Sequence, residues 1–336
     1  MFVRRSLAVA LIALTGCRPS TIGEAESRHD IQWLDENGTP DAIAAIGRLA
    51  DTDAKAVTAV EARSFFDAQA FVAAWAAVAR GSRWGANTIR LGLADPKRAD
   101  LAAGAMSKGG VLLVPFLGDL DASLVRLAAS AHNLNVSSTL ASAGSPARKI
   151  IMQRLVDAST RAPMCRGIAS KNADANARAA LLEVPESARD APSCVDAVVR
   201  VAADDDAALT WLASLAEPGL LGAAGSSSTM PCSRLHVVWT KALALRPPEE
   251  RAALTVPLGY AVKRCPAELD GVLADAVVHL PATRRMVVEA IDPFAAYGGA
   301  LQATCAALPA VAEGGHDSAI VRERASDALG HMCGVP

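Results

Sequence analysis

Alanine dominates this chain, with 72 of its 336 residues, whereas aromatic residues make up only 4%. Alanine has the highest helix propensity of all amino acids, and its small side chain lets neighbouring helices approach closely. Strands are instead enriched in β-branched and aromatic residues. The composition therefore predicts an all-α protein with closely packed helices.

The spacing of apolar residues agrees with that prediction. In several segments apolar residues recur three or four positions apart, which is the pattern of one buried face of an amphipathic helix. Three segments show it clearly: Leu124, Leu127, Ala128, Ala131 and Leu134; Leu235, Val238, Trp239, Ala242 and Leu245; Phe71, Val72, Trp75 and Val78. We find no comparable segment in which apolar and polar residues alternate, so no sheet is expected.

Prolines mark several expected helix starts. Proline is favoured in the first turn of a helix, directly after a residue whose side chain caps the free N–H groups. Four dipeptides have this form: Thr39-Pro40, Asp95-Pro96, Ser145-Pro146 and Asp292-Pro293. The helical stretches between such signals are short, which predicts an array of helical hairpins.

Two parts of the chain resemble HEAT-like repeats. Ile320–Gly330 contains a valine–arginine pair followed by Ala-Leu-Gly, as in the second helix of such a repeat. Residues 39–49, a turn at residues 51–53 and residues 54–62 are similar to a whole repeat. The resemblance implies a right-handed α-solenoid of stacked helical hairpins. Residues 160–310 depart from the pattern, so irregular repeats are expected there. A non-repetitive all-α domain is the alternative.

The first sixteen residues read as a signal peptide. Arg4 and Arg5 precede an apolar run from Leu7 to Leu14, which at about 1.5 Å per residue reaches only ~12 Å, too short to cross a bilayer. The run ends in Leu14-Thr15-Gly16-Cys17, which resembles the lipobox of bacterial lipoproteins. In that family the chain is cut before the cysteine, which then carries a diacylglyceryl group and usually an acylated amino terminus. An ordinary secretory peptide is the alternative.

This resemblance implies that Cys17 is a lipid anchor and that the protein is exported to the cell envelope. The next residue is Arg18, where lipoproteins kept at the inner membrane often carry an aspartate, so the outer membrane is favoured. Residues 17–30 are then the lipidated cysteine and a polar tether. No later apolar run is long enough to span a bilayer, so the lipid is the only membrane attachment expected.

Six further cysteines all lie in the second half of the chain: Cys165, Cys194, Cys232, Cys265, Cys305 and Cys333. An even number in an exported chain favours disulfide bonds, and six cysteines allow fifteen complete pairings. Ala162-Pro163-Met164-Cys165 and Ala191-Pro192-Ser193-Cys194 are near-copies, and each is expected to place its cysteine just inside a helix start. In a solenoid, equivalent helices of adjacent repeats lie side by side, so the repeat architecture favours pairing in sequential order.

The glycine- and serine-rich segment Leu221–Met230 is predicted to be a flexible loop. It divides the mature chain into N-terminal helical repeats over residues 31–220 and disulfide-rich C-terminal repeats over residues 231–336. This division is a prediction from composition alone.

Sequence motifs for catalysis are missing. The chain lacks a phosphate-binding G-x-x-x-x-G-K-[ST] loop, a G-x-S-x-G elbow and an H-E-x-x-H zinc helix. Its formal charge of −2 gives no basic excess for binding nucleic acid. We therefore expect no cofactor, no metal site and no nucleic-acid partner.

Residues Arg80, Arg83 and Trp84 are the best candidates for partner recognition, because they share a glycine-bounded loop. Packing of Trp84 over a helix pair is the structural alternative. The function favoured by the sequence is a lipid-anchored scaffold or adaptor that binds a protein or peptide on its helical-repeat surface. An envelope enzyme with a polar pocket in an all-α fold is the other possibility.

Overall fold

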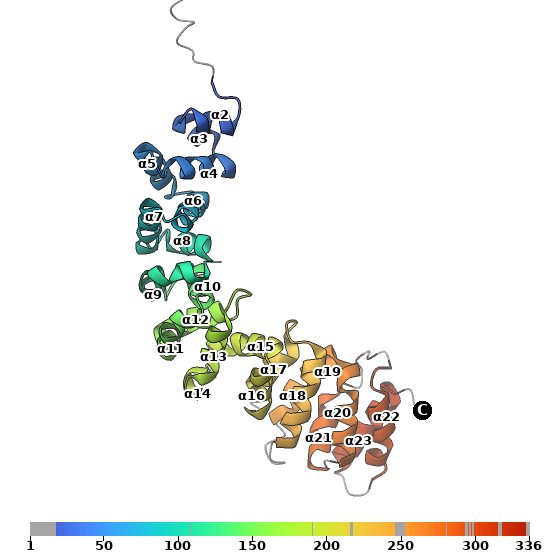
Figure 1. Cartoon of the computed structure of the whole chain (residues 1–336). Helices are drawn as coiled ribbons and strands as arrows, with labels where there is room; N and C mark the ends of the chain where they lie inside the picture. Colours follow the sequence, from blue (N-terminus) through green and yellow to red (C-terminus); the bar gives the residue numbers. More distant parts are fainter. Residues whose placement is uncertain are drawn as a thin grey trace, which may run out of the picture. The chain divides into compact units, whose positions relative to one another are not determined.

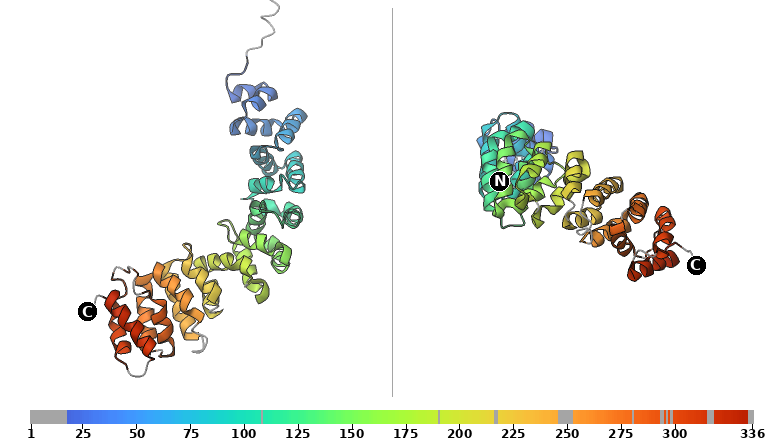
Figure 2. Two further views of the ribbon diagram at one scale, coloured as in Figure 1. Left: turned by 180° about the vertical axis from the view of Figure 1, so that it is seen from behind. Right: turned by 90° about the horizontal axis from the view of Figure 1, so that it is seen from below.

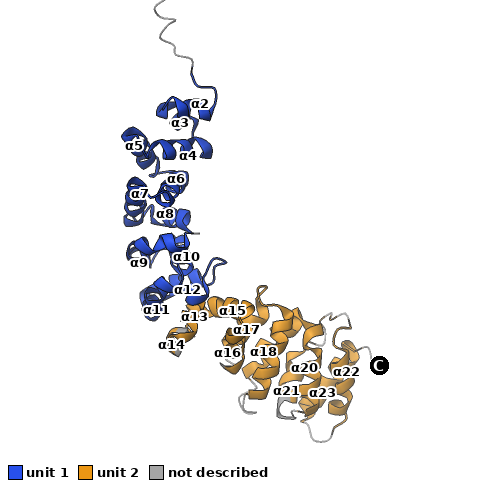
Figure 3. Ribbon diagram, in the orientation of Figure 1, with its two compact units in different colours: residues 1–177 blue, residues 178–336 orange. Residues whose placement is uncertain are grey.

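The computed structural model describes residues 18–107, 109–189, 191–215, 218–245, 253–279, 281–292, 295, 297, 299–314 and 318–333. Within these ranges the chain is all-α and contains no strand (Figure 1). It forms two compact units, Met1–Ala177 and Arg178–Pro336 (Figure 3). None of the helices in these ranges combines the length and apolar character needed to cross a membrane. Cys17, the predicted lipid anchor, lies outside the described residues.

Unit 1 consists of short helices joined by tight turns. Its elements are α2 (Ile22–Ser27), α3 (Ile31–Asn37), α4 (Pro40–Leu49), α5 (Ala54–Arg63), α6 (Ala68–Ala79), α7 (Arg83–Ala94), α8 (Ala99–Met106), η1 (Gly110–Phe116), α9 (Leu117–Arg126), α10 (Leu134–Ser142), η2 (Ser145–Ala147), α11 (Arg148–Val156) and α12 (Ala158–Ile168). The division between the units falls inside α13 (Ala175–Glu183).

Unit 2 continues in the same manner. Its elements are α14 (Glu186–Arg189), η3 (Pro192–Cys194), α15 (Val195–Asp204), α16 (Asp206–Leu215), α17 (Pro218–Ser226), α18 (Cys232–Leu245), α19 (Thr255–Arg264), α20 (Pro266–His279), α21 (Pro281–Ala290), α22 (Gln302–Ala312) and α23 (Ala319–His331).

Within each unit the helices form two layers, because most helices contact both the next helix and the next but one. In unit 1 one layer contains α4, α6, α8, α10 and α12, and α7 and α9 lie in the other. In unit 2 the layers are α16, α18, α20, α22 and α15, α17, α19, α21, α23 (Figures 1 and 2). Each unit is therefore a stack of helical pairs.

Aspartate side chains join successive pairs in unit 1. Asp100, in the first turn of α8, accepts hydrogen bonds from the backbone N–H groups of Asn135 (2.8 Å) and Val136 (3.2 Å). Both amides belong to the first turn of α10, where N–H groups have no partner inside their own helix. Because a residue near the start of α8 caps the start of α10, the two helices run parallel.

Asp270 repeats this arrangement in unit 2. It lies in α20 and accepts hydrogen bonds at 2.8 Å from the backbone N–H groups of Ala303 and Thr304, in the first turn of α22. The hydroxyl of Thr304 also donates to Asp270, at 2.7 Å. The same capping contact thus orders equivalent helices in both units.

Most of the helices predicted from sequence are confirmed. The first HEAT-like segment corresponds to α4 and α5, and Ile320–Gly330 lies within α23. The apolar stripe beginning at Leu235 lies on α18, where Trp239 is fully buried. The stripe beginning at Phe71 lies on α6, although Val72 on that helix is exposed.

The helix predicted from Leu124 to Leu134 is wrong, because a turn interrupts it between α9 and α10. The buried side chain of Asn133 donates to the carbonyl oxygens of Leu127 (2.9 Å) and Ser130 (2.7 Å). An asparagine side chain that binds nearby backbone in this way competes with helix formation. Leu124 and Leu127, before the break, are buried, whereas Leu134, the first residue of α10, is 50% exposed. The apolar spacing therefore did not mark one continuous buried face.

The predicted tether also needs correction, because part of it is helical. Residues Ile22–Ser27 form α2, whose start is capped by the hydroxyl of Thr21 accepting from the N–H of Glu24. Ala25 in this helix is fully buried in a core cluster with Leu34 and Ile46. Ile22 also packs against this cluster, and the other residues of α2 are glycine or polar, which gave the segment the composition of a linker.

The flexible loop predicted at Leu221–Met230 is likewise wrong over most of its length. Residues 221–226 belong to α17, and Leu221 is fully buried. A side chain at Gly225 would approach the backbone nitrogen of Ala261, in α19, to 3.0 Å. This glycine therefore serves close contact between helices rather than flexibility.

Proline-based helix starts are confirmed in part. α4 begins at Pro40, and the hydroxyl of Thr39 caps it. Pro146 lies at the start of a short 3-10 helix, η2. After Asp95 the chain first makes a turn, and α8 begins only at Ala99. Pro293 lies outside the described residues.

Two disulfide bonds match the predicted sequential order. Cys232 is bonded to Cys265, and Cys305 is bonded to Cys333. Cys165 and Cys194 are also disulfide-bonded, and their pairing with each other stays a prediction. Cys194 ends η3 and directly precedes α15, so it lies one residue before the helix start rather than just inside it. Cys165, in contrast, lies towards the end of α12 with Pro163 inside the helix, so its predicted position at a helix start is wrong.

We expect the variant Cys305→Ser/Cys333→Ser to lose about 3 kcal/mol of unfolding free energy, because the disulfide closes a loop that spans 28 residues. The loss should appear in urea unfolding of the oxidised full-length protein. The wild-type protein in the presence of a reductant should be destabilised at least as much.

Peptide mapping of the wild-type protein without reductant provides the matching control. It should recover Cys232 linked to Cys265, Cys305 to Cys333 and Cys165 to Cys194. Any other linkage would contradict the stacked arrangement of the pairs.

Candidate partner-binding surfaces

Two of the three predicted recognition residues, Arg80 and Trp84, converge on one carboxylate, Asp51, in the turn after α4. Nε of Arg80 donates to Asp51 at 2.8 Å, and Nε1 of Trp84 donates to it at 2.9 Å. The hydroxyl of Ser82 donates to the same carboxylate. Arg80 also donates to the backbone carbonyl of Gly47, near the end of α4, at 3.0 Å. Arg80 and Trp84 therefore join one helical pair to the next.

These contacts change the acidity of Asp51. Its partial burial favours the neutral form, but the hydrogen bonds from Arg80, Ser82 and Trp84 outweigh burial and lower the pKa of Asp51 to about 2. The carboxylate therefore stays charged over the whole neutral and mildly acidic range.

Trp84 does not lie in a loop, as its neighbouring glycines suggested, but in the first turn of α7. Its partly buried ring packs against the core cluster of the first helices, which includes Leu34 and Val60. Arg83, by comparison, is exposed. A role in partner binding for Arg80, Arg83 and Trp84 stays a prediction, while the structural role of Arg80 and Trp84 is visible in the contacts.

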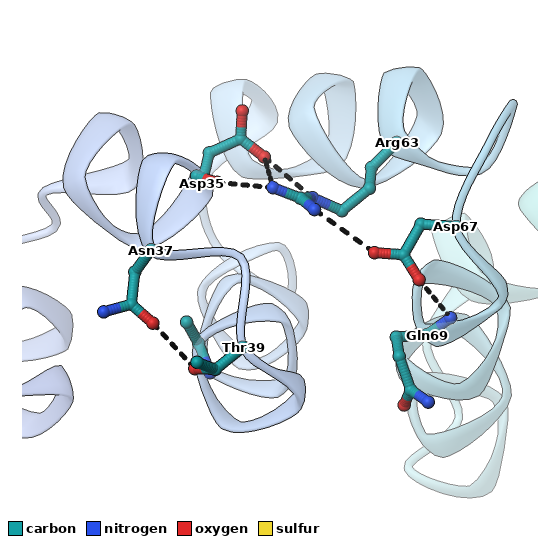
Figure 4. A network of polar contacts seen from close by, with 7 residues as sticks. Asp35, Asn37, Thr39, Arg63, Asp67 and Gln69 are labelled. Carbon is teal, nitrogen blue, oxygen red and sulfur yellow. Dashed lines mark hydrogen bonds and ion pairs between the residues drawn. The ribbon is translucent and has the colours of Figure 1, made fainter.

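A second polar network joins α3 to the turn between α5 and α6 (Figure 4). Nε of Arg63 donates to Asp35 in α3 at 2.9 Å, and Nη1 donates to Asp67 at 3.2 Å. Asp67 also accepts the N–H of Gln69 at 2.8 Å and so caps α6. The Arg63 side chain is largely buried. It fixes the turn between α5 and α6 to the preceding pair.

Unit 1 has a small groove between α4 and α6, with a volume of about 140 Å³. Arg48 and Arg80 line it together with the exposed Val72. Both arginines already have carboxylate partners, since Arg48 pairs with Glu26 at 2.7 Å. Val72 is the one large apolar side chain that is exposed among the residues lining this groove.

A larger groove, of about 380 Å³, lies across α19, α21 and α23 in unit 2. Val256 and Tyr260 are four residues apart and so share one face of α19, where they are 62% and 51% exposed. Lys263 follows on the same face and pairs with Asp292 at 3.3 Å. Arg324 of α23, which is exposed, lines the groove from the opposite side. We call this the α19–α21–α23 groove.

The other layer of unit 2 carries a groove of about 360 Å³ between α18 and α20. His236 and Thr240 line it from α18, and Gly271 and Asp275 line it from α20. Nδ1 of His236 lies 2.8 Å from the carbonyl oxygen of Glu268, which fixes the ring at the helix contact. Among the described residues no cluster of three His, Cys, Asp or Glu side chains has the spacing to hold a metal ion.

Sequence reasoning missed both grooves of unit 2. The i, i+4 spacing of Val256 and Tyr260 was a usable signal, but the same spacing also marks the buried face of a helix. Which of the two applies depends on α21 and α23, which lie far along the chain. Comparison of the chain with family models, curated proteins and solved structures finds no match.

We expect Asp51→Asn to lower the unfolding free energy of the protein by about 1 kcal/mol at pH 7, because charge-assisted hydrogen bonds are weakened at a half-exposed site. The pKa of Asp51 is lowered by folding, so its contribution is present above an unfolded-state pKa of about 3.9. It is lost as the pH falls through about 2.

Urea unfolding of the wild-type protein and the variant at several pH values between 7 and 2 measures this effect. The difference between them should shrink below pH 4. Glu61→Gln, on α5 in the same unit, is the matched control and should show no such difference. A constant difference down to pH 2 would contradict the assigned hydrogen bonds.

Proposed function

We propose that this protein is a lipid-anchored scaffold of the cell envelope, held to the membrane through Cys17. The disulfide bonds support export, because such bonds persist in oxidising compartments and are rare in the cytosol. The lipobox resemblance of Leu14–Cys17 supports the anchor. The outer membrane remains the favoured destination because Arg18, rather than an aspartate, follows the cysteine.

We further propose that both units are HEAT-like stacks. Two features support this: helices contact the next but one along the chain, and polar contacts between pairs recur at similar separations. Trp84 and Asp51 are 33 residues apart, Val136 and Asp100 are 36 apart, and Thr304 and Asp270 are 34 apart. A period of this size is typical of α-solenoid repeats.

The α19–α21–α23 groove is the proposed partner site. The main support for this proposal is the way in which the helices build the groove. Three successive helices of one layer build it, which is how solenoids form extended binding surfaces. Tyrosine and arginine are the residue types that most often dominate binding energy, and the groove offers Tyr260 and Arg324. The partner that fits is an extended protein segment with an apolar side chain for Val256 and Tyr260 and a carboxylate for Arg324.

A photoreactive phenylalanine analogue placed at Tyr260 of the full chain in native membranes tests the site. We expect a discrete crosslinked partner, and Arg324→Glu should reduce that product more than about tenfold, as for loss of a hot-spot contact. The same analogue at Val278, an exposed position on α20 in the other layer, is the matched control. Equal products from both positions, or none from Tyr260, would rule out this groove.

Membrane attachment is measured in the same preparations. Cys17→Ser should release the protein from the membrane fraction while leaving its fold intact by circular dichroism. A variant that stayed with the membranes through a carbonate wash would contradict the lipid anchor.

A further inference from the structure

Two adjacent phenylalanines stand out on the surface of unit 1. Phe65 and Phe66 form the turn between α5 and α6, and they are 66% and 74% exposed. The other described phenylalanines, Phe71 and Phe116, are buried. Isolated exposed apolar residues are common in proteins, but two neighbouring phenyl rings in one short turn form a compact apolar tip.

Arginine side chains support both rings. The guanidinium of Arg98 lies 4.0 Å from the centre of the Phe65 ring, and that of Arg63 lies 5.9 Å from the centre of the Phe66 ring. These arginines are themselves fixed, Arg98 by Asp95 at 2.7 Å and Arg63 by the network of Figure 4. The tip is therefore held in place and does not need to order when it meets a partner surface.

The position of this tip relative to the start of the domain is fixed by a short series of contacts. Arg18 forms an ion pair with Glu36, near the end of α3. The neighbouring residue Asp35 binds Arg63, and Arg63 lies against Phe66. Arg18 and the tip therefore lie on the same edge of unit 1. In the sequence, Cys17 directly precedes Arg18.

We propose that Phe65 and Phe66 insert into the bilayer that holds the acyl chains of Cys17. This inference rests on the proposed lipid anchor. The occupant is a lipid surface because the anchor brings that surface to the edge on which the two rings are exposed. Phenylalanine is among the residues that enter the boundary between headgroups and acyl chains.

The insertion has a definite role. Two or more acyl chains on Cys17 already hold the protein stably, so the tip is not needed for attachment. An anchor at a single residue, however, leaves the domain free to tilt. A second, rigid contact on the same edge restricts that tilt and fixes which face of unit 1 meets the membrane.

The test is an environment-sensitive fluorophore on Phe66→Cys in the full lipidated chain, reconstituted into phosphatidylethanolamine–phosphatidylglycerol vesicles. A lipid that carries a nitroxide near the headgroup should quench it at least about threefold, because the side chain lies at the headgroup boundary. The control is Val111→Cys, which is 81% exposed in η1. Arg98, which lies against Phe65, directly precedes α8, whereas Val111 follows the end of that helix. The label at position 111 is therefore separated from the tip by the length of α8 and should remain unquenched.

Phe65→Cys is a second labelling site and should give the same quenching if Phe66→Cys impairs folding, which circular dichroism would reveal. Intact mass determines whether Cys17 is acylated. If the protein is acylated but the labels at positions 65 and 66 stay in water, or are shielded by a bound protein instead of lipid, the proposed insertion is wrong and the lipid anchor is unaffected. Protein without acylation overturns both the anchor and the insertion.

Discussion

Polar contacts between successive helical pairs determine how this alanine-rich chain packs. The exposed N–H and carbonyl groups at helix ends need partners, and here the partners come from the neighbouring pair. Asp100 and Asp270 cap the next-but-one helix, while Ser123 donates to the carbonyl of Leu93 near the end of α7 at 2.6 Å. Alanine faces permit close approach but specify register poorly, so we infer that these directional contacts set the register of each stack.

The local parts of the fold were predictable because short-range chemistry decides them. α4 has both its capping threonine and its first-turn proline, and α18 has a regular apolar stripe with Trp239 at its centre. Asn133 ends a helical pattern through hydrogen bonds to nearby backbone. The other two failures share one physical cause, because α2 docks through Ala25, and α17 approaches α19 closely at Gly225, by contacts with other segments. Single-segment patterns carry no information on such contacts.

The same limit applies to the functional surfaces. Arg80 and Trp84 were reasonable candidates for recognition by residue type. In the structure both donate hydrogen bonds to Asp51, about thirty positions earlier in the chain, and so join two helical pairs. The α19–α21–α23 groove exists only because three separated helices come together. The Phe65–Phe66 dipeptide differs from these surfaces, because the sequence alone shows two adjacent aromatic residues between Ser64 and Asp67. What the sequence could not supply was their position on the same edge as Arg18.

The central claim is that contacts between pairs order the helices they cap, and residue-resolved hydrogen exchange tests it most directly. In the wild-type protein the amides of Ala303 and Thr304 should be as protected as those inside α22, because Asp270 accepts both. In Asp270→Ala this protection should be lost through the first turn of α22, whereas Asp275→Ala, which changes an exposed residue of the same helix, should leave it intact. Fast exchange of both amides in the wild-type protein, or unchanged exchange in Asp270→Ala, would contradict the account.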